Sequence, residues 1–311
     1  MARYLSSKLI YMLISLFILA SATFFLMKII PGDPFQSEKA IPPEIKKSIM
    51  AYYGLDKPLG EQYVNYMKNL VTGDLGMSMK MQHTSVVKII KGSFGYSAQL
   101  GIIAIITSVI VGLFLGLVAA LHHRKLLDNL AMIVAVIGVS VPNFVLASIM
   151  QFVLGEKLGW FKVAGLNGPL DYVMPVIALS ALPVAFIARL TRSSMLEVLS
   201  SDYIKTAKAK GLAKNVVLIK HALRNGIMPV VTYVGPLTAN IITGSVVVEK
   251  IFGIPGLGKF FVQSVGNRDY TLIMGITLFY AVILMSARFL TDVAYGFVDP
   301  RIKLSNRKGG A

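Results

Sequence analysis

The sequence predicts an all-α integral membrane protein with six transmembrane helices, and three observations support this fold class. Of the 311 residues, 55% are hydrophobic and only 15% are charged, whereas soluble domains carry about 25% charged residues. The mean hydropathy is +0.68. The apolar residues also stand in long blocks rather than being spread along the chain. These features exclude an ordinary cytosolic enzyme and a disordered chain.

Six apolar blocks have the length of membrane-spanning helices, since about 20 apolar residues cross the hydrocarbon core of a bilayer. Several blocks contain prolines, among them Pro142, Pro183 and Pro236, which are tolerated where neighbouring helices or polar groups satisfy the freed backbone. We therefore expect kinked helices packed in a bundle. In chain order the blocks are Leu9–Met27, Tyr96–Leu121, Leu130–Leu154, Tyr172–Ala188, Gly226–Val248 and Thr271–Ala287.

The first block has a second interpretation. Arg3 and Lys8, followed by an apolar run and by Ala20-Ser21-Ala22, also resemble a secretory signal peptide with its cleavage site. The apolar run continues past this site to Ile30, and its length favours a retained helix. A mature protein that starts at Thr23 would contradict that preference.

The distribution of basic residues predicts the orientation of the helices. The two ends and the loops 122–129 and 191–225 together carry 16 Lys and Arg, against 5 in the opposite short loops 155–171 and 249–270. Cytoplasmic loops of membrane proteins collect such residues, so both termini are expected in the cytoplasm. The same rule explains the net charge of +16 without nucleic-acid binding. Because the chain has no cysteine, disulfides and thiolate metal sites are excluded.

Between the first two blocks, the segment 31–95 is expected to be extracellular and folded. Two amphipathic helices are predicted in it because apolar residues recur at helical spacing, and the first begins at Pro42-Pro43. We expect them to form a cap on the bundle, since the segment is short for a domain with its own core. The recurring residues are Ile45, Ile49 and Tyr53 in the first helix and Tyr63, Tyr66, Met67 and Leu70 in the second.

Gly253–Phe260 resembles a phosphate-binding loop, but its context contradicts that interpretation. The glycines and Lys259 have the right spacing, yet Phe260 stands where Ser or Thr must bind magnesium, and no strand is expected before it. We expect a tight glycine-rich turn instead. No catalytic motif such as HExxH or GxSxG occurs. The six blocks contain no acidic residue, which argues against a proton- or sodium-coupled carrier.

The loop 191–225 is the most informative segment outside the blocks. Asp202 can cap a short helix that Gly211 then ends in the left-handed conformation. A second helix is expected from about Ala213 to Asn225. Such a hairpin has the shape to dock in a partner's groove. A solvated basic loop accounts for the same residues equally well.

The hairpin and several other segments resemble ABC importer permeases. Thr206–Gly211, followed by His221–Asn225 and Pro229, is similar to their EAA loop, although Lys205 stands at the position of the broad family's glutamate. More specifically, the chain resembles the oligopeptide and dipeptide permease family, and looks most like the first, B-type permease subunit of an oligopeptide importer. Further similar segments cover nearly the whole chain: Pro31–Pro34, Tyr53–Pro58, Gly73–Gly76, Ser140–Phe144, Phe252–Gly258, Asn267–Tyr270 and Asp299–Arg301.

This resemblance implies a type I ABC importer permease fold and a non-catalytic subunit in the plasma membrane of a prokaryote. Such a subunit translocates oligopeptides that an extracellular binding protein delivers. It pairs with a second homologous permease and with two ATPases that bind ATP and magnesium. No cofactor, metal or nucleic acid is expected on this chain. The hairpin would be the ATPase-coupling site, with Asp202 as helix cap, Ala207 and Gly211 shaping the contact, and Lys208 or Lys210 at its rim. The full set is Asp202, Tyr203, Thr206, Ala207, Lys208, Lys210 and Gly211.

Polar residues within the blocks are candidates for lining a translocation path, with hydrogen bonding between helices as the alternative explanation. These residues are Asn143, Gln151, Tyr233 and Asn240.

Four regions are expected along the chain. They are a cytoplasmic N-terminus with the first helix (1–30), the extracellular segment (31–95), the permease core including the hairpin (96–290) and a cytoplasmic tail (291–311). A dipeptide or nickel importer permease is the alternative within the family. A self-sufficient carrier or channel, or a membrane enzyme, is the alternative outside it.

Overall fold

The computed structural model describes residues 2–29, 34–35 and 42–298, apart from the side chains of 2–5, 239–240, 242–244, 292 and 294–298. This part of the chain is helical, with one isolated bridge between Met77 and Ser85 and no β-sheet. It forms two compact units, each considered by itself. The first unit comprises the described residues of 1–95 and 256–289, and the second those of 96–255 and 290–311.

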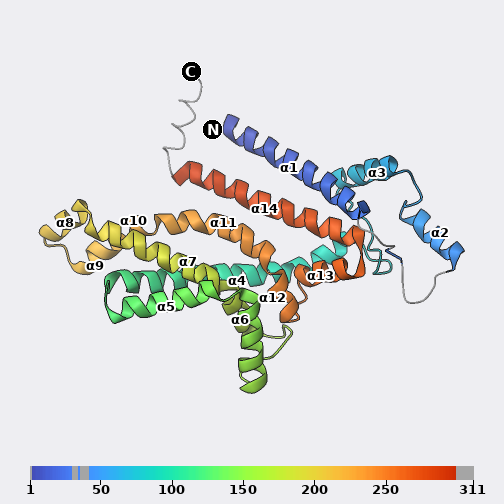
Figure 1. Ribbon diagram of the computed structural model, residues 1–311. Helices are drawn as coiled ribbons and strands as arrows, with labels where there is room; N and C mark the ends of the chain where they lie inside the picture. The colour runs from blue at the N-terminus through green and yellow to red at the C-terminus, as the bar shows by residue number, and fades with distance from the viewer. Residues whose placement is uncertain (1, 30–33, 36–41, 299–311) are drawn as a thin grey trace. The chain divides into compact units, whose positions relative to one another are not determined.

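Figure 1 shows the order of the helices along the chain. The first unit holds α1 (Ala2–Ile29), α2 (Pro43–Tyr52), α3 (Leu59–Val71), the start of α4 (Val86–Leu121), α13 (Leu257–Asn267) and most of α14 (Tyr270–Val298). The second unit holds the rest of α4, then α5 (Leu126–Ser140), α6 (Asn143–Met150), the π-helix η1 (Gln151–Lys157), the 3-10 helix η2 (Pro169–Tyr172), α7 (Val173–Ser200), α8 (Asp202–Ala209), α9 (Lys214–Val216), the π-helix η3 (Val217–Leu223), α10 (Arg224–Gly226), α11 (Met228–Gly244) and α12 (Val246–Ile251).

Among the described residues, four helical stretches are long and apolar enough to cross a membrane, and a bent pair of helices makes a fifth at most. The expected six spans are therefore not confirmed. The four stretches are Ser6–Ile29, Val86–Leu121, Pro169–Ser200 and Tyr270–Thr291, and the bent pair is Leu126–Ser140 with Asn143–Lys157.

The third predicted block, Leu130–Leu154, is not a single helix, and the structure corrects this expectation. α5 ends at Ser140, and the helical segment that begins at Asn143 departs from it by 102°, a bend visible in Figure 1. Pro142 causes the break, because proline lacks an N–H group and disfavours a helical conformation in the residue before it. That residue, Val141, is extended, with φ −97° and ψ 118°.

Other blocks also have different limits from those expected, and the helix of the second, α4, begins at Val86 rather than at Tyr96. The fifth is divided between α11, which has 17 residues, and α12, with the break at Ser245. The fourth is expected to end at Ala188, but α7 continues to Ser200. Its last turns remain amphipathic and bury Met195 completely, so the helix persists after the apolar run has ended. The loop expected over 191–225 therefore starts only after Ser200.

In the first unit, α3 packs against α1 through aromatic side chains. Phe24 of α1 is 3% exposed. Its ring centroid lies 5.3 Å from that of Tyr66, in a stacked arrangement, and 5.4 Å from that of Tyr63. Ser21 and the Tyr63 hydroxyl are also within hydrogen-bonding distance, at 2.7 Å. The two short helices predicted between residues 31 and 95 are confirmed as α2 and α3.

Asp269 joins the start of α14 to a loop that lies far away in the sequence. Its buried carboxylate accepts hydrogen bonds from the backbone N–H groups of Leu272 and Met79, both at 3.1 Å, and from the hydroxyl of Ser78. Tyr53 in turn donates to the carbonyl of Ser78 at 2.7 Å. The aspartate therefore caps a helix and fixes a loop with the same two oxygens.

In the second unit, α7 is the central helix and its neighbours approach it closely through glycines. A Cβ added at Gly116 of α4 would lie 2.5 Å from the carbonyl oxygen of Ala188, and one at Gly138 of α5 would lie 2.7 Å from that of Ala181. Real Cβ atoms are not found at such distances, so only glycine permits this packing. α7 is thereby held between α4 and α5.

Candidate functional site

The hairpin, defined as residues 201–226, extends beyond the end of α7 (Figure 1). Its first helix, α8, begins at Asp202, and the residue at the cap position is Ser201, which has an extended conformation (φ −69°, ψ 154°). The expectation that Asp202 itself is the cap is therefore wrong by one residue. Asp202 lies in the first turn, where its negative charge interacts favourably with the positive end of the helix dipole. It also forms an exposed ion pair with Lys205 at 2.8 Å.

Gly211 ends α8 in the left-handed conformation, as the sequence predicts. Its φ is +78°, its N–H donates to the carbonyl of Lys208 at 3.0 Å, and the N–H of Leu212 donates to that of Ala207 at 3.4 Å. These two bonds satisfy carbonyls that the helix end would leave without partners. A Cβ at Gly211 would meet nothing within 4 Å, so the backbone angle, not space, requires glycine here.

The second arm is helical from Lys214 to Gly226, which confirms the expected helix over about Ala213 to Asn225. Its middle, η3, is a π-helix, a feature that the sequence does not predict. The arm is joined to α8 by a hydrogen bond of 3.0 Å from the side-chain amide of Asn225 to the hydroxyl of Tyr203.

The hairpin has one buried face and one exposed face. Ile204 and Ala207 of α8 are buried together with Met195 of α7 and with Val217 and Ala222 of the second arm. The small side chain of Ala207 thus allows the two arms to pack closely. The exposed residues of the hairpin include Tyr203, Lys208, Lys210 and Gly211, which the sequence assigns to the docking site, together with Leu212 and Ile219.

A buried ion pair, here called the base clamp, lies where α7 approaches the start of α5. The carboxylate of Asp128 is bound by the guanidinium of Arg192 through two contacts, 2.6 Å from Nε to Oδ1 and 2.8 Å from Nη2 to Oδ2. Asp128 also accepts from the backbone N–H of Arg124 at 2.9 Å. Its side chain is 3% exposed and that of Arg192 is 27% exposed. The clamp fixes α7 to α5 shortly before the hairpin begins.

The base clamp is not apparent from the sequence because its two halves are 64 residues apart. Each half carries a weak signal of its own. Asp128 is an acidic residue in a short basic loop, and Arg192 follows a long apolar run. Nothing in the sequence indicates that the two side chains meet.

The four candidate path residues do not form one site. Gln151 donates to the carbonyls of Val163 and Ile251, at 2.7 and 3.0 Å, which agrees with the alternative explanation of hydrogen bonding between segments. The ring of Tyr233 stacks on Phe186, with centroids 5.0 Å apart. Asn143 is half-buried at the start of α6. The side chain of Asn240 lies outside the described residues.

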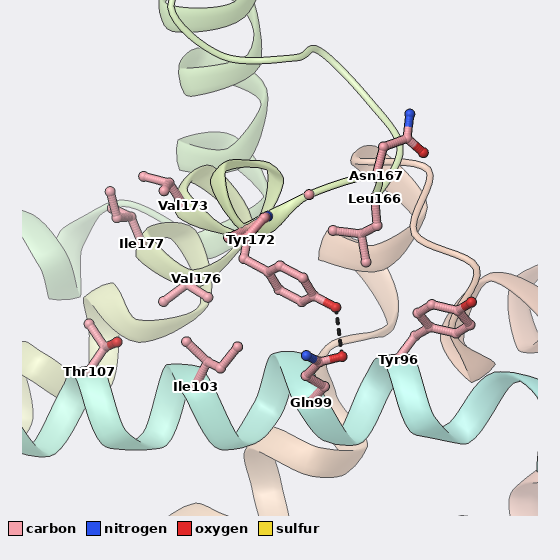
Figure 2. Close-up of a pocket in the computed structure, with 12 residues that line it drawn as sticks. Tyr96, Gln99, Ile103, Thr107, Leu166, Asn167, Tyr172, Val173, Val176 and Ile177 are labelled. Atoms are coloured by element: carbon pink, nitrogen blue, oxygen red, sulfur yellow. Dashed lines mark hydrogen bonds between the residues drawn. The ribbon is translucent and has the colours of Figure 1, made fainter.

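A cavity of about 660 Å³ lies elsewhere, between α4 and the start of α7. Figure 2 shows its walls, with the Tyr172 hydroxyl donating to Gln99 at 2.9 Å. None of the three path candidates with described side chains lines this cavity. It is a feature that the sequence analysis does not anticipate.

The segment that resembles a phosphate-binding loop is a turn only in its first half. The residues before it form the helix α12, not a strand, and Gly253 has a φ of +62°. The carbonyl of Phe252 accepts from the backbone N–H of Gly165 at 2.8 Å. The expected glycine-rich turn is confirmed over 253–256, whereas Leu257 to Phe260 belong to the first turn of α13. Among the residues that the structure describes, no three His, Asp or Glu side chains gather where they could hold a metal ion.

Comparison with known proteins gives full-length relatives. Residues 112–304 match the family "Binding-protein-dependent transport system inner membrane component", and residues 1–100 match its N-terminal counterpart. The dipeptide transport system permease protein DppB of Bacillus subtilis is 50% identical over 311 residues, which cover 99% of this chain and all of that protein. The oligopeptide transport system permease protein OppB of Haemophilus influenzae is 41% identical over 305 residues, 97% of this chain and all of that protein.

Solved structures support the fold. A crystal structure of an amino acid ABC transporter aligns with a TM-score of 0.53 and 18% identity over 67% of this chain and 92% of that chain. An inward-facing structure of the MetNI methionine ABC transporter aligns with the same TM-score and identity over 68% of this chain and 94% of that chain. At this identity the likeness concerns the fold alone.

Proposed function

We infer the function from one premise, that this chain belongs to the family of binding-protein-dependent transport system inner membrane components. It is the non-catalytic permease subunit of an ATP-driven ABC importer of peptides, and it is a multi-pass membrane protein. The relatives named for dipeptides and for oligopeptides both match over nearly the full length. We propose oligopeptides as the substrate, with a dipeptide or nickel importer as the alternative.

The hairpin is proposed as the surface on which a cytoplasmic ATPase docks. The observation that carries this proposal is a hairpin with an exposed face that follows the central helix of its unit and packs on the end of that helix. Four of its lysines, Lys205, Lys208, Lys210 and Lys214, are exposed, and Tyr203 and Leu212 add apolar surface, at 43% and 41% exposed. A cationic rim around apolar residues is suited to an acidic groove with an apolar floor.

The base clamp and the glycine contacts support this role. α8 follows α7 after a break at Ser201, and the hairpin packs on the end of α7 because Ile204 and Ala222 are buried together with Met195. A force on the hairpin therefore acts on α7 through this packing. Closure of an ATPase pair would then shift the equilibrium of the bundle between inward- and outward-facing states. ATP and magnesium are assigned to the ATPases, and this chain supplies the mechanical connection.

The remaining components are proposed from the family. They are a second homologous permease, two ATPases and an extracellular peptide-binding protein, assembled in the plasma membrane of a prokaryote with both termini of this chain in the cytoplasm. The segment 31–95 is proposed to face outward, the core to extend over 96–290 and the tail over 291–311. Asn143, Tyr233 and Asn240 remain candidates for the path, whereas the two hydrogen bonds of Gln151 favour a positioning role.

The test is purification of this chain from native membranes in mild detergent, with mass spectrometry of the proteins that accompany it. A second permease and ATPases at matching stoichiometry are expected. Isolation of the chain alone, or as a homo-oligomer without an ATPase in several mild detergents, would favour a self-sufficient carrier or channel instead.

The docking surface has its own test within the same complex. Tyr203→Ala combined with Leu212→Ala removes apolar surface from the exposed face, and it is expected to reduce ATPase recovery. Ile133→Ala combined with Leu130→Ala, two similarly exposed apolar positions on α5, serves as the matched control. Equal ATPase recovery in both double variants would contradict the assignment of the hairpin.

A further inference from the structure

We propose that the cavity between α4 and the start of α7 receives an apolar side chain of the transported peptide. This inference rests on the proposed function and adds to it the residues that meet the substrate. The cavity volume of about 660 Å³ lies within the range of about 300–1,000 Å³ found for sites that bind small ligands.

The walls of the cavity come from two helix faces within the second unit. Tyr96, Gln99, Ile103 and Thr107 of α4 recur every three or four residues, so they share one face of the helix. Figure 2 shows Val176 and Ile177 of α7 opposite Ile103 and Thr107, and Tyr172 opposite Gln99. The cavity is therefore mainly aliphatic around Ile103, Val176 and Ile177 and polar around Tyr172, Gln99 and Tyr96.

The polar groups are uncharged, and this decides what the cavity can accept. Tyr172 and Gln99 bind one another, which leaves the side-chain amide nitrogen of Gln99 without a protein partner among the described residues. Tyr96 adds a second hydroxyl group. Uncharged donors and acceptors suit the amide groups of a peptide, whereas no residue that lines the cavity carries a charge to pair with the charged ends of a peptide. An acyl chain would satisfy none of these polar groups.

The position of the cavity agrees with this occupant. It lies at the first turns of α7, and the hairpin lies at the other end of the same helix. A helix of 28 residues is about 42 Å long at 1.5 Å per residue, which is enough to separate the two faces of a membrane. The cavity is thus at the end away from the proposed ATPase, where a binding protein would deliver peptide.

The absence of cysteine from the chain allows a direct test in the assembled complex. Ile177→Cys places a thiol in the cavity wall, and Ile102→Cys places one on α4 outside the cavity. The two isoleucines are matched, at 43% and 50% exposed. In proteoliposomes that contain the full complex, a thiol-reactive maleimide is applied with or without the tripeptide Ala-Phe-Ala.

At a peptide concentration about tenfold above its Kd, labelling of the Ile177→Cys variant is expected to slow by about tenfold, because the thiol reacts only while the cavity is empty. Labelling of the Ile102→Cys variant is expected to stay unchanged. If the labelling rate of Ile177→Cys is the same with and without peptide but changes with the acyl-chain length of the vesicle lipids, the occupant is a lipid and the proposal is overturned. If the Ile177→Cys thiol is blocked in the complex but free in the isolated chain, a partner subunit fills the cavity, and this result overturns the proposal as well.

A second pair of variants measures uptake. Ile177→Trp fills the cavity and is expected to lower uptake of Ala-Phe-Ala by about tenfold relative to Ala-Ala-Ala, whereas Ile102→Trp preserves the wild-type ratio. The cavity proposal is overturned if Ile177→Trp lowers uptake of both peptides equally and peptide does not protect the thiol of Ile177→Cys. Normal uptake by the wild-type complex would still support the importer function in that case. A wild-type complex that assembled but transported neither peptide would refute the proposed function itself, and the cavity proposal with it.

Discussion

Replacement of Asp128 by Asn is the sharpest test of the base clamp. The substitution preserves the size of the side chain but removes its charge, and it turns one hydrogen-bond acceptor into a donor. Two contacts with Arg192, at 2.6 and 2.8 Å, are weakened, and the contact with the N–H of Arg124 becomes repulsive if the amide nitrogen faces it.

The magnitude follows from burial. Loss of one partner from a buried ion pair costs about 3–5 kcal/mol, and a hydrogen bond to a charged group contributes about 1.5–3 kcal/mol. Arg192 is 27% exposed, so its charge regains part of its hydration after the substitution. We therefore expect a loss of about 2–3 kcal/mol in the free energy of unfolding, somewhat less than breaking a fully buried pair costs.

The assay is denaturation of the purified chain by dodecyl sulfate in mixed micelles. Asp202→Asn is the matched control, because Asp202 also pairs with a basic residue, Lys205, but its side chain is 96% exposed. That variant is expected to change the free energy of unfolding little, since exposed pairs contribute little. Equal effects of the two substitutions would refute the reasoning from burial.

Three further predictions concern the hairpin and the outer segment. Gly211→Ala is expected to destabilise α8 by about 1 kcal/mol, because a left-handed residue with a Cβ is strained, and to lower ATPase recovery. The control is Gly266→Ala, at a helical glycine with open space around it, which should leave ATPase recovery unchanged. Tyr203→Phe removes the hydroxyl that Asn225 binds and should increase hydrogen exchange in the second arm, whereas unchanged exchange would show that the bond does not hold the arms together. Phe24→Ala removes the ring contacts with Tyr63 and Tyr66 of α3, each worth about 1 kcal/mol, and should accelerate proteolysis within α3. Phe17→Ala, at a position 59% exposed, should leave the rate unchanged.

Local rules predict the hairpin well, and they fail where distant segments meet. The end of α8 at Gly211 follows from one residue's conformational freedom, so the sequence is sufficient to predict it. Pro142 signals a disturbance in the third block, but the size of the bend depends on tertiary packing, which no local rule contains. The pairing of Asp128 with Arg192 depends on two helices lying side by side, and a single sequence carries no record of that.

The cavity and the path residues illustrate the same limit. Gln151 is polar in an apolar block, which fits a path and a structural hydrogen bond equally well, and only the positions of the carbonyls of Val163 and Ile251 distinguish the two. The cavity is formed by apolar residues of α4 and α7 that look like ordinary parts of membrane spans. Composition identifies a membrane-spanning helix but does not indicate which of its faces lines a cavity.

The glycine contacts of α7 limit how this helix can move. A twist of α7 about its own axis would drive bulkier atoms toward Gly116 on one side and Gly138 on the other, where the backbone of α7 already leaves no room for a methyl group. Tilting together with α4 and α5 preserves both contacts. These contacts therefore favour movement of the three helices as one body, so that a displacement at the hairpin end of α7 is accompanied by a displacement at its cavity end.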